Sequence, residues 1–572
     1  MVKQTFVGRV AGFSLMAMFA GSVQAADVRI APGVLRELDA SGGLTLAWVT
    51  FSDKGDAAAV RDAVESLQTT YNADAMRRRQ LRRTDPGLFD ERDLPLQLAY
   101  VDAIRATGVE VRAQSRWLNC VSIQASREQI QAIAKLPHVT SISAVASSKF
   151  RAAEQVGLAV DVPYGSRESI NYGLALNQLT QINLPALHDA GFTGQGVIVG
   201  VLDTGFVRSH AVFTNPAKPL QVIAERDFIN DDNNAGQQPG DPSAQGNHGT
   251  YILGTLAAYL PGSLVGAAFD AKYVLCKTEV EPTETQIEED YFVEGLEFAE
   301  LNGADLVTAS LGYDDWYTQA DFDGETAVTT RAVNIATANG VHFTVAAGNN
   351  GWDSNPSTST LGAPADAFDA ITCGAVNVNG VIASFSSSGP TADGRVKPEV
   401  LARGVSTVTV APNSDVNFYG VSGTSLSTPL VAGAVACLVQ ARPTWTVAQM
   451  RQYLIDNSSR SVAGIGPDPM FVLGYGIMNA GRILTTDCNG NGVSDFTDIG
   501  GESSDRNDDN IPDECGRMCL ADYNIDGFLD FTDFDDFVAD FEAGRTTADA
   551  NNDGFLDFTD FDAFVSAFEV GC

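Results

Sequence analysis

The stretch VIVGVLDTG, residues 197–205, decides the fold of this chain. Its apolar run over residues 197–202 predicts a buried strand. Thr204 and Gly205 then allow the chain to turn away tightly. Asp203 lies between the apolar run and Thr204. An acid directly after a buried strand must be hydrogen-bonded to be tolerated there. Asp203 is therefore the first candidate functional residue.

Outward from this strand, strands and helices are predicted to alternate up to about residue 485. Further strands are expected at 273–276, 306–310 and 342–346, and helices at 251–260, 291–302 and 328–339. Such alternation is typical of an α/β fold with a doubly wound, mostly parallel sheet and helices on both faces. Ligands of these sheets bind in the crevice at the carboxyl ends of the strands.

Three more motifs fall where strands end or helices begin. His248 lies in GNHGT, residues 246–250, and Ser425 in GTSLSTP, residues 423–429, which opens a long apolar helix to residue 439. Asn349 follows the strand at 342–346, where its amide is able to donate to a developing oxyanion. Taken singly, each has an ordinary explanation as a turn or helix-cap residue. Together, their order Asp203, His248, Ser425 on an α/β sheet is that of the subtilisin triad.

Residues from about 180 to 485 resemble the subtilases through DTG (203–205), HGT (248–250), AGN (347–349) and GTSLSTP (423–429). The resemblance implies a serine endopeptidase in which Ser425 attacks the scissile carbonyl, His248 transfers the proton and Asp203 orients the imidazole. It implies an oxyanion hole formed by Asn349 and the Ser425 N–H. The implied substrate-binding residues are Ser310, Leu311, Gly312, Ala347 and Gly348, and the first three would pair with the substrate backbone.

The departures from the family pattern do not touch a catalytic atom. Tyr251 stands where many members carry a second histidine, and Arg403 where a proline is common. The alternative function is a non-enzymatic binding protein on a degenerate protease fold. Degenerate members usually lose a triad residue, and none is lost here, so an active enzyme is the favoured interpretation.

The part before the catalytic region is predicted to be processed. Residues 1–25 read as a signal peptide, with Lys3 and Arg9 before an apolar run that is short for a membrane anchor. They predict a secreted or extracellular protein, with cell-surface attachment open and no membrane span after cleavage. Residues 26–150 form a small α+β domain with strands at 44–51, 116–124 and 139–145, and helices at 95–107 and 129–136. The resemblance implies that this is an inhibitory propeptide, followed by a linker and processing region (151–180) and the catalytic domain (181–485).

A cluster of arginines lies inside the predicted propeptide, comprising Arg77, Arg78, Arg79, Arg82 and Arg83. One interpretation is a solvated helix face. The other is a basic surface that contacts an acidic partner domain. Acidic stretches at 227–232 and 279–290 are similarly open to two interpretations, a solvated surface or a site for calcium or basic substrates.

The C-terminal part is strongly acidic, with 23 Asp and Glu against three Arg in residues 487–572. Two copies of an EF-hand-like calcium loop lie there, with aspartate in place of the usual glutamate at position 12. The expected ligands are Asp522, Asn524, Asp526, Phe528, Asp530 and Asp533, then Asp549, Asn551, Asp553, Phe555, Asp557 and Asp560. Residues 517–572 resemble dockerin modules, and residues 487–516 resemble thrombospondin type 3 calcium repeats.

Calcium is accordingly the expected cofactor, and a disordered tail is the alternative. The module is either a stabilising spacer or a dockerin that binds a cohesin-like or surface scaffold. The recurring phenylalanines of the two loops' following helices are expected to form a shared core. A net charge of −36 argues against nucleic acid as a partner, because phosphate would be repelled. The expected partners are polypeptide substrates and the chain's own propeptide.

Overall fold

The computed structural model describes most of the chain. The described residues are 29–41, 43–145, 154–157, 170–281, 287–314, 317–485 and 494–499, with 521, 523, 529, 531–545, 548, 550 and 556–570 at the C-terminal end. The expected signal peptide lies outside them. So do nine of the twelve expected calcium ligands: Asp522, Asn524, Asp526, Phe528, Asp530, Asp549, Asn551, Asp553 and Phe555.

The catalytic part is built on a seven-stranded sheet in which every neighbouring pair is parallel. Its order is β15-β14-β13-β12-β7-β11-β8. The strands are β7 (Ile198–Asp203), β8 (Gln221–Asp227), β11 (Lys272–Lys277), β12 (Leu306–Ala309), β13 (His342–Ala346), β14 (Ile371–Val376) and β15 (Val400–Arg403). All six residues of β7 are buried, as the apolar run predicted.

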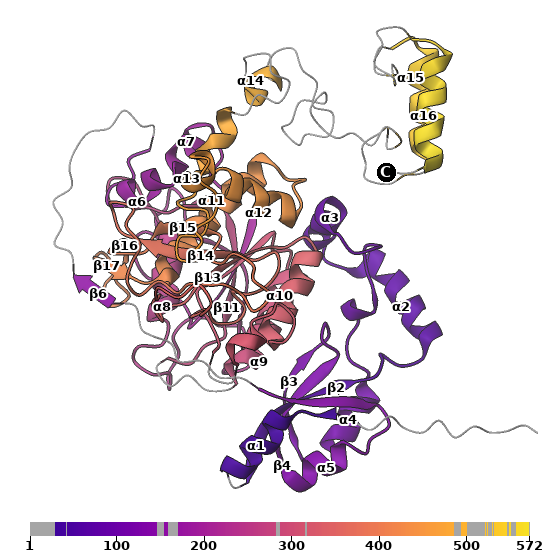
Figure 1. Cartoon of the computed structure of the whole chain (residues 1–572), viewed down its shortest axis with the longest axis vertical. Coiled ribbons are helices and arrows are strands. Elements are labelled where there is room, and N and C mark those ends of the chain that lie inside the picture. Colours follow the sequence, from indigo (N-terminus) through magenta and orange to yellow (C-terminus); the bar gives the residue numbers. More distant parts are fainter. Residues whose placement is uncertain are drawn as a thin grey trace, which may run out of the picture.

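Helices cover both faces of this sheet, which confirms the predicted α/β class (Figure 1). Helices α8 (Asn247–Ala257) and α11 (Thr424–Ala441) contribute to the core on one face, and α9 (Glu288–Leu301) and α10 (Val328–Ala338) to the core on the other. Helix α8 ends before the predicted residue 260, because Tyr259 and Leu260 pair as β9 (Tyr259–Leu260) with β10 (Leu264–Val265). Among the described residues, only α11 is apolar and long enough to cross a membrane, and 94% of it is buried inside the domain.

The N-terminal domain has a five-stranded sheet of order β1-β5-β2-β4-β3. Its elements are β1 (Arg29–Ile30), α1 (Pro32–Ser41), β2 (Leu44–Phe51), α4 (Leu98–Arg105), β3 (Glu110–Ser115), β4 (Cys120–Ser126), α5 (Arg127–Ile133) and β5 (Val139–Ala144). The expected strand at 116–124 is wrong in its first part. Residues 116–119 instead turn between β3 and β4, and Asn119 takes the left-handed conformation (φ 51°) that such a turn requires.

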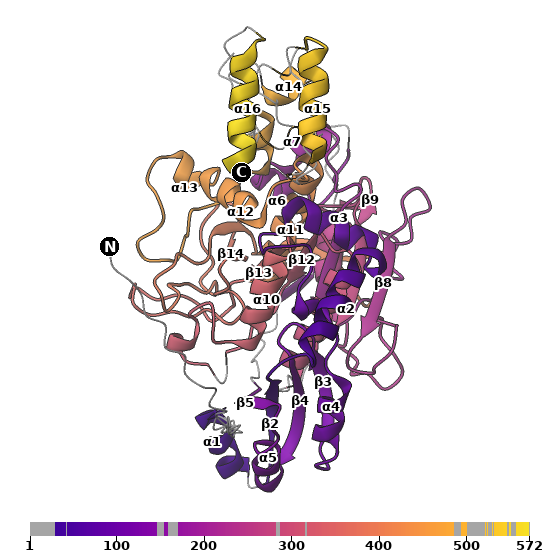
Figure 2. The same ribbon diagram turned by 90° about the vertical axis from the view of Figure 1, so that its right-hand side faces the viewer.

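An arm is inserted into this domain between β2 and α4, and we define it as residues 56–93. It holds α2 (Ala57–Thr70), α3 (Ala73–Arg82) and the 3₁₀ turn η1 (Glu91–Asp93). Figures 1 and 2 show α2 and α3 leaving the small sheet and following the side of the catalytic domain. Helix α2 has no buried residue, so the arm is held through α3 and η1.

The expected linker at 151–180 is in part structured. Strand β6 (Glu154–Gly157) pairs antiparallel with β17 (Phe418–Ser422), which pairs with β16 (Thr407–Val410). Tyr172 and Leu179 are buried in the catalytic core, and α6 (Leu176–Gln181) and α7 (Leu184–Asp189) follow. The catalytic domain therefore begins before residue 181, because these side chains need its core for burial.

The remaining elements close the catalytic domain and form the C-terminal module. They are η2 (Gln319–Asp321), α12 (Val447–Asp456), α13 (Ser459–Val462), η3 (Ala480–Thr485), α14 (Asp495–Ile499), α15 (Phe531–Glu542) and α16 (Phe558–Val570). Helices α15 and α16 pack together through phenylalanines, and the Phe537 and Phe564 rings stack with centroids 4.0 Å apart. This confirms the expected shared core of the two helices.

Candidate active site

The candidate residues gather at the carboxyl edge of the parallel sheet. Asp203 is the last residue of β7, Ser310 follows β12, and Asn349 lies three residues after β13. Strand β7 lies between β12 and β11, so the strand order reverses next to it. The backbones that diverge at such a reversal leave a crevice, which is where open α/β sheets place their sites.

Asp203 and His248 form a direct pair. The His248 Nδ1 atom lies 2.7 Å from the Asp203 Oδ1 atom, and both side chains are buried. The same carboxylate oxygen accepts a hydrogen bond from the Thr204 N–H at 2.8 Å. Burial lowers the pKa of His248, but the Asp203 carboxylate outweighs that effect and raises the pKa above its ordinary value.

A glycine next to His248 allows this pairing. His248 is the second residue of α8, and Gly249 follows it. A Cβ atom at Gly249 would lie 2.2 Å from the Gly205 carbonyl oxygen, closer than atoms can approach. Only glycine therefore lets the start of α8 lie against the turn that carries Asp203, which explains the HGT motif in packing terms.

Ser425 is the second residue of α11 and is buried. Its hydroxyl lies 3.4 Å from the Ser310 carbonyl oxygen, to which it donates. Its own carbonyl would normally accept the N–H of residue 429, which is proline and has none. The Ser310 hydroxyl donates to that carbonyl at 2.9 Å instead. Pro429, the sixth residue of α11, lies beyond the first turn, and the side chain of Ser310 at the end of β12 compensates for its missing N–H.

Asn349 is held with its amide nitrogen available as a donor. Its Oδ1 atom accepts hydrogen bonds from the Thr424 N–H at 2.9 Å and from the Thr424 hydroxyl at 3.0 Å. These contacts fix which end of the amide faces the helix. The Ser425 N–H lies in the first turn of α11, where backbone N–H groups have no intrahelical acceptor. Two N–H donors thus lie beside the serine.

A small cavity of about 40 Å³ adjoins Ser425. All five expected substrate-binding residues line it, namely Ser310, Leu311, Gly312, Ala347 and Gly348. The sequence did not indicate Asp314, Asn350 and Gly362, which also line it. They come from loops whose spacing carries no local motif; the Asn350 amide donates to the Asp314 carboxylate at 3.0 Å.

The two acidic stretches within the catalytic domain are solvated only in part: Asp231 is exposed, whereas several of the other carboxylates are buried. Asp227 pairs with the buried Lys277 at 2.8 Å, and Glu279 is buried and accepts from the Tyr313 hydroxyl at 2.6 Å. Within the parts of the chain that the structure describes, no group of three or more His, Cys, Asp or Glu side chains is arranged to hold a metal ion. A larger cavity, of about 690 Å³, lies between β3 and α9 and not at Ser425.

The departures from the family pattern are accommodated by packing. Tyr251 is buried against Val421 and Leu426, so its ring fills apolar space beside α11. The Arg403 guanidinium donates to the Val405 carbonyl oxygen at 2.8 Å and so braces the loop after β15.

Two family models match this chain. The model of the subtilase family matches residues 194–496, and that of the peptidase S8 propeptide domain of Bacteroidota matches residues 46–157. Subtilisin E of Bacillus subtilis (strain 168) is 32% identical over 355 residues, which is 62% of this chain and 79% of that protein. Subtilisin of Bacillus pumilus is 34% identical over 312 residues, 54% of this chain and 98% of that protein.

Among solved structures, the crystal structure of fervidolysin from Fervidobacterium pennivorans, described as a keratinolytic enzyme related to subtilisin, shares this fold. It has a TM-score of 0.52 and 22% sequence identity, and the match covers 79% of this chain and 62% of that chain. The chain belongs to the subtilase family of serine endopeptidases, with an S8-type propeptide domain ahead of its catalytic domain.

Proposed function

We propose that this protein is a secreted, self-processing subtilisin-like endopeptidase with Asp203, His248 and Ser425 as its triad. The observation that carries the proposal is the 2.7 Å contact between His248 Nδ1 and Asp203 Oδ1 at the sheet edge that also holds Ser425. His248 takes the hydroxyl proton as Ser425 attacks the scissile carbonyl, then gives it to the leaving amine. Asp203 stabilises the imidazolium that forms between these steps.

Asn349 and the Ser425 N–H then stabilise the tetrahedral oxyanion. Fixed donors serve this purpose because they need no reorganisation as charge develops. The substrate backbone binds along Ser310, Leu311 and Gly312, with Ala347 and Gly348 on the other wall of the cavity.

Labelling with a fluorophosphonate probe tests the triad. Processed wild-type protein is expected to be modified at Ser425, and Ser425→Ala protein is not. Ser427→Ala is the matched control, since Ser427 lies two positions further along the same helix and donates to the Thr424 carbonyl. Absence of label on processed wild-type protein would sink the proposal and favour a non-enzymatic binding protein.

The position of β6 supports self-processing. Glu154 pairs with Ser422, three residues before Ser425, and the two strands are antiparallel. The N-terminal end of β6, at Glu154, is therefore the end of the strand nearer to Ser425. The N-terminal end of β6 also lies at the start of the expected processing region. We therefore place the maturation cut at residues 150–154.

Expression of two chains tests this point. Wild-type protein should lose its N-terminal part and begin at a residue between 151 and 155, as read by N-terminal sequencing. The Ser425→Ala chain should remain whole in a protease-free host. If that chain is cut at the same place, another enzyme performs the processing.

Calcium is the proposed ligand of the C-terminal module, with residues 487–516 as a repeat segment and 517–572 as a paired loop module. The described part fits a cation that prefers oxygen ligands: Asp533 and Asp560, the position-12 residues, are buried carboxylates in the first turns of α15 and α16. Asp557 lies beside Asp560, whose carboxylate accepts the Asp557 N–H at 2.8 Å. When bound, calcium would neutralise these carboxylates and order the module.

Attachment and export complete the proposal. A pulldown with full-length protein in calcium or in chelator separates a stabilising spacer from a module that binds a cohesin-like scaffold. Export rests on residues 1–25, and N-terminal sequencing of the Ser425→Ala chain from a secreting host should start at Ala26.

A further inference from the structure

Helix α3 of the arm docks on the catalytic domain through arginines. Its buried residues are Ala75, Arg78, Arg79 and Arg82, so three of its four buried side chains carry a guanidinium. The expectation of a solvated arginine face is therefore wrong for these three, whereas Arg77, on the same helix, is exposed. A helix held by charged side chains needs a receiving site that satisfies each charge, because an unpaired buried charge is very costly.

The catalytic domain supplies such a site, which we call the guanidinium socket. It consists of the Glu300 and Asp305 carboxylates and the main-chain carbonyls of Glu300, Ala304 and Asn339. Arg78 donates to the Ala304 oxygen at 2.8 Å, to the Glu300 and Asn339 oxygens at 3.3 Å, and to the Glu300 carboxylate. Arg82 pairs with Asp305.

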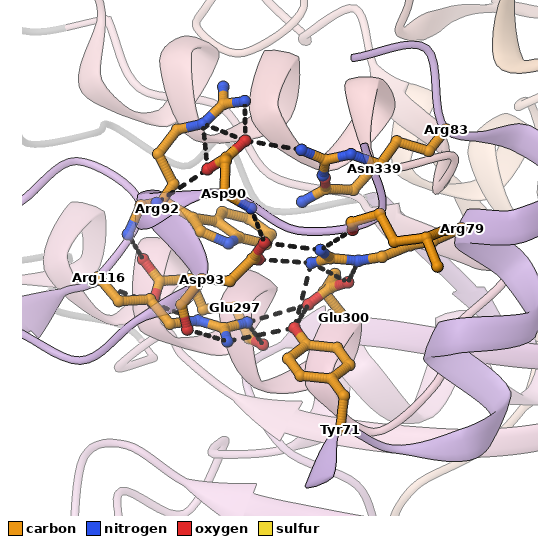
Figure 3. A network of polar contacts seen from close by, with 12 residues as sticks. Tyr71, Arg79, Arg83, Asp90, Arg92, Asp93, Arg116, Glu297, Glu300 and Asn339 are labelled. Carbon is orange, nitrogen blue, oxygen red and sulfur yellow. Dashed lines mark hydrogen bonds and ion pairs between the residues drawn. The ribbon is translucent and has the colours of Figure 1, made fainter. Parts of the chain in front are cut away.

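Glu300 is the centre of the socket (Figure 3). Its carboxylate accepts from Arg79 at 2.9 Å, from Arg116 at 2.9 Å and from the Tyr71 hydroxyl at 2.7 Å. Arg79 also forms a bidentate pair with Asp93 of η1, at 2.6 and 2.8 Å. Asp93 thus supplies a counter-charge for Arg79 from within the arm. The Glu300 side chain is fully buried.

Two glycines bring the helix close enough for these contacts. Gly303 (φ 88°) and Gly340 (φ 79°) form the turns before β12 and β13. A Cβ atom at Gly303 would lie 2.6 Å from Asp74 Cβ, and one at Gly340 would lie 2.7 Å from Arg82 Cβ. The backbone of α3 therefore lies directly on both turns.

The socket lies at the opposite edge of the sheet from the triad. Asp305 comes just before β12 and Ser310 just after it, and a strand of four residues spans roughly 13 Å. Asn339 and Asn349 flank β13 in the same way. A cut near β6, at the carboxyl edge, therefore leaves every contact of α3 with the socket in place.

We propose that the guanidinium socket is a second anchor for the propeptide, independent of the active site, which keeps the cut propeptide on the catalytic domain. The occupant is α3 of this chain, and release requires that Arg78 and Arg79 leave Glu300. This inference rests on the proposed function in one respect, namely that the chain cuts itself near β6. Processing and release are then separate steps, and the second is governed by the arm.

The test uses an inactive chain, so that it does not depend on the triad. A recognition sequence for a highly specific protease is placed between Ala144 and Glu154 in the Ser425→Ala protein, and the chain is cut with that protease. Dissociation of the N-terminal fragment is followed by size-exclusion chromatography after dilution. The fragment should stay bound in this protein and in its Arg77→Gln variant, which is the matched control.

The double variant Arg78→Gln/Arg79→Gln should release the fragment about 100-fold faster, because the buried Glu300 carboxylate then keeps only Arg116 of its three arginine partners and Asp93 loses its bidentate pair. Arg82→Gln, whose partner Asp305 is partly exposed, should release it about tenfold faster and serves if the double variant does not fold. Equal release from all four proteins, or equal acceleration by Arg77→Gln, would overturn the anchor. Neither result would bear on Ser425, which fluorophosphonate labelling tests separately.

Discussion

At the scale of single residues, the candidate site depends on contacts between residues far apart in the chain. Asn349 faces the serine with its donor end because Thr424 occupies its acceptor end. The Ser425 carbonyl is satisfied by Ser310 because Pro429 has no N–H. Each of these hydrogen bonds satisfies a buried polar group that would otherwise lack a partner. The same contacts therefore stabilise the fold and position the catalytic groups.

Replacing Asn349 by Ala or by Asp removes the side-chain donor to the oxyanion. Both changes are expected to lower kcat by about 100- to 1000-fold with little change in KM, because the lost contact is made only in the transition state. Steady-state kinetics on a peptide substrate measure this. Asp preserves shape but not the donor, so if Asn349→Asp retained activity, shape and not hydrogen bonding would be the role of Asn349.

The activity should fall on the acidic side with a midpoint above about 6.5, the ordinary pKa of histidine. Asp203 raises the pKa of His248, and the protonated imidazole cannot accept the serine proton. In Asp203→Asn protein the midpoint should move down, and kcat should fall by about 10⁴-fold. A pH profile of kcat/KM measures both; an unchanged midpoint would contradict the assigned pair.

At the scale of elements, α9 presents a row of carboxylates to the propeptide. Asp290, Glu294, Glu297 and Glu300 follow one another at helical spacing. Asp290 accepts from Ser122, Glu294 from the Gln114 N–H at 2.9 Å, and Glu297 from Ser115 at 2.6 Å. The acidic residues thus form an interface, and β3 and β4 supply its donors.

This row makes propeptide binding depend on pH. Burial raises the pKa of Glu294 to about 7, with Glu297 and Asp231 adding to the effect and Arg226 opposing it. The bound form then holds a proton that the separated domain loses near the ordinary value of about 4.3. Binding is therefore strongest at low pH, and it weakens as the pH rises from about 4.5 through about 7.

Fragment release from the cut Ser425→Ala chain, measured from pH 5 to 8, should accelerate across this window. Glu294→Gln should flatten the dependence, though not remove it, because burial also raises the pKa of Glu297 and of Asp290. Glu65→Gln, on the exposed helix α2, is the control and should behave as the parent. A slope that is unchanged in Glu294→Gln would contradict this role of Glu294.

At the scale of the whole molecule, three parts divide the work. The catalytic sheet carries the site at its carboxyl edge and receives the arm of the propeptide at the other edge. Figures 1 and 2 show the arm helices α2 and α3 along the side of the catalytic domain. The C-terminal module has its own phenylalanine core, with Phe537 and Phe564 at its centre. Because the triad lies in a separate core, the module's stability and the enzyme's activity should respond separately to calcium.

Removal of calcium with a chelator should lower the unfolding temperature of the C-terminal module and leave the activity on a short peptide substrate unchanged. The closely spaced carboxylates of the loops then repel one another without a cation. Calorimetry of the full chain with and without calcium measures this. Asp533→Asn should mimic chelation in part. A single transition unaffected by calcium would contradict the proposed loops.

The sequence was sufficient for the class of the fold and for the residues at its functional edge. A buried apolar run ending in Asp203 predicts a central strand. The motifs HGT (248–250) and GTSLSTP (423–429) predict two helix starts, because small residues are needed where the backbone turns into a helix. These signals are local, so each is legible within a few residues. Helix α5 also begins through a local signal, the capping box between Ser126 and Gln129.

What only the tertiary structure decided is where charged residues find their partners. Nothing near Arg78 or Arg79 in the sequence indicates that Glu300, more than 200 residues away, receives them. Likewise, Asp314 joins the cavity beside Ser425 only through the folding of its loop. Helical spacing shows which arginines share a face of α3. It does not show whether that face is solvated or buried, because water and a buried carboxylate both satisfy a guanidinium. The choice between them depends on which surface packs against that face, and only the folded chain brings the two together.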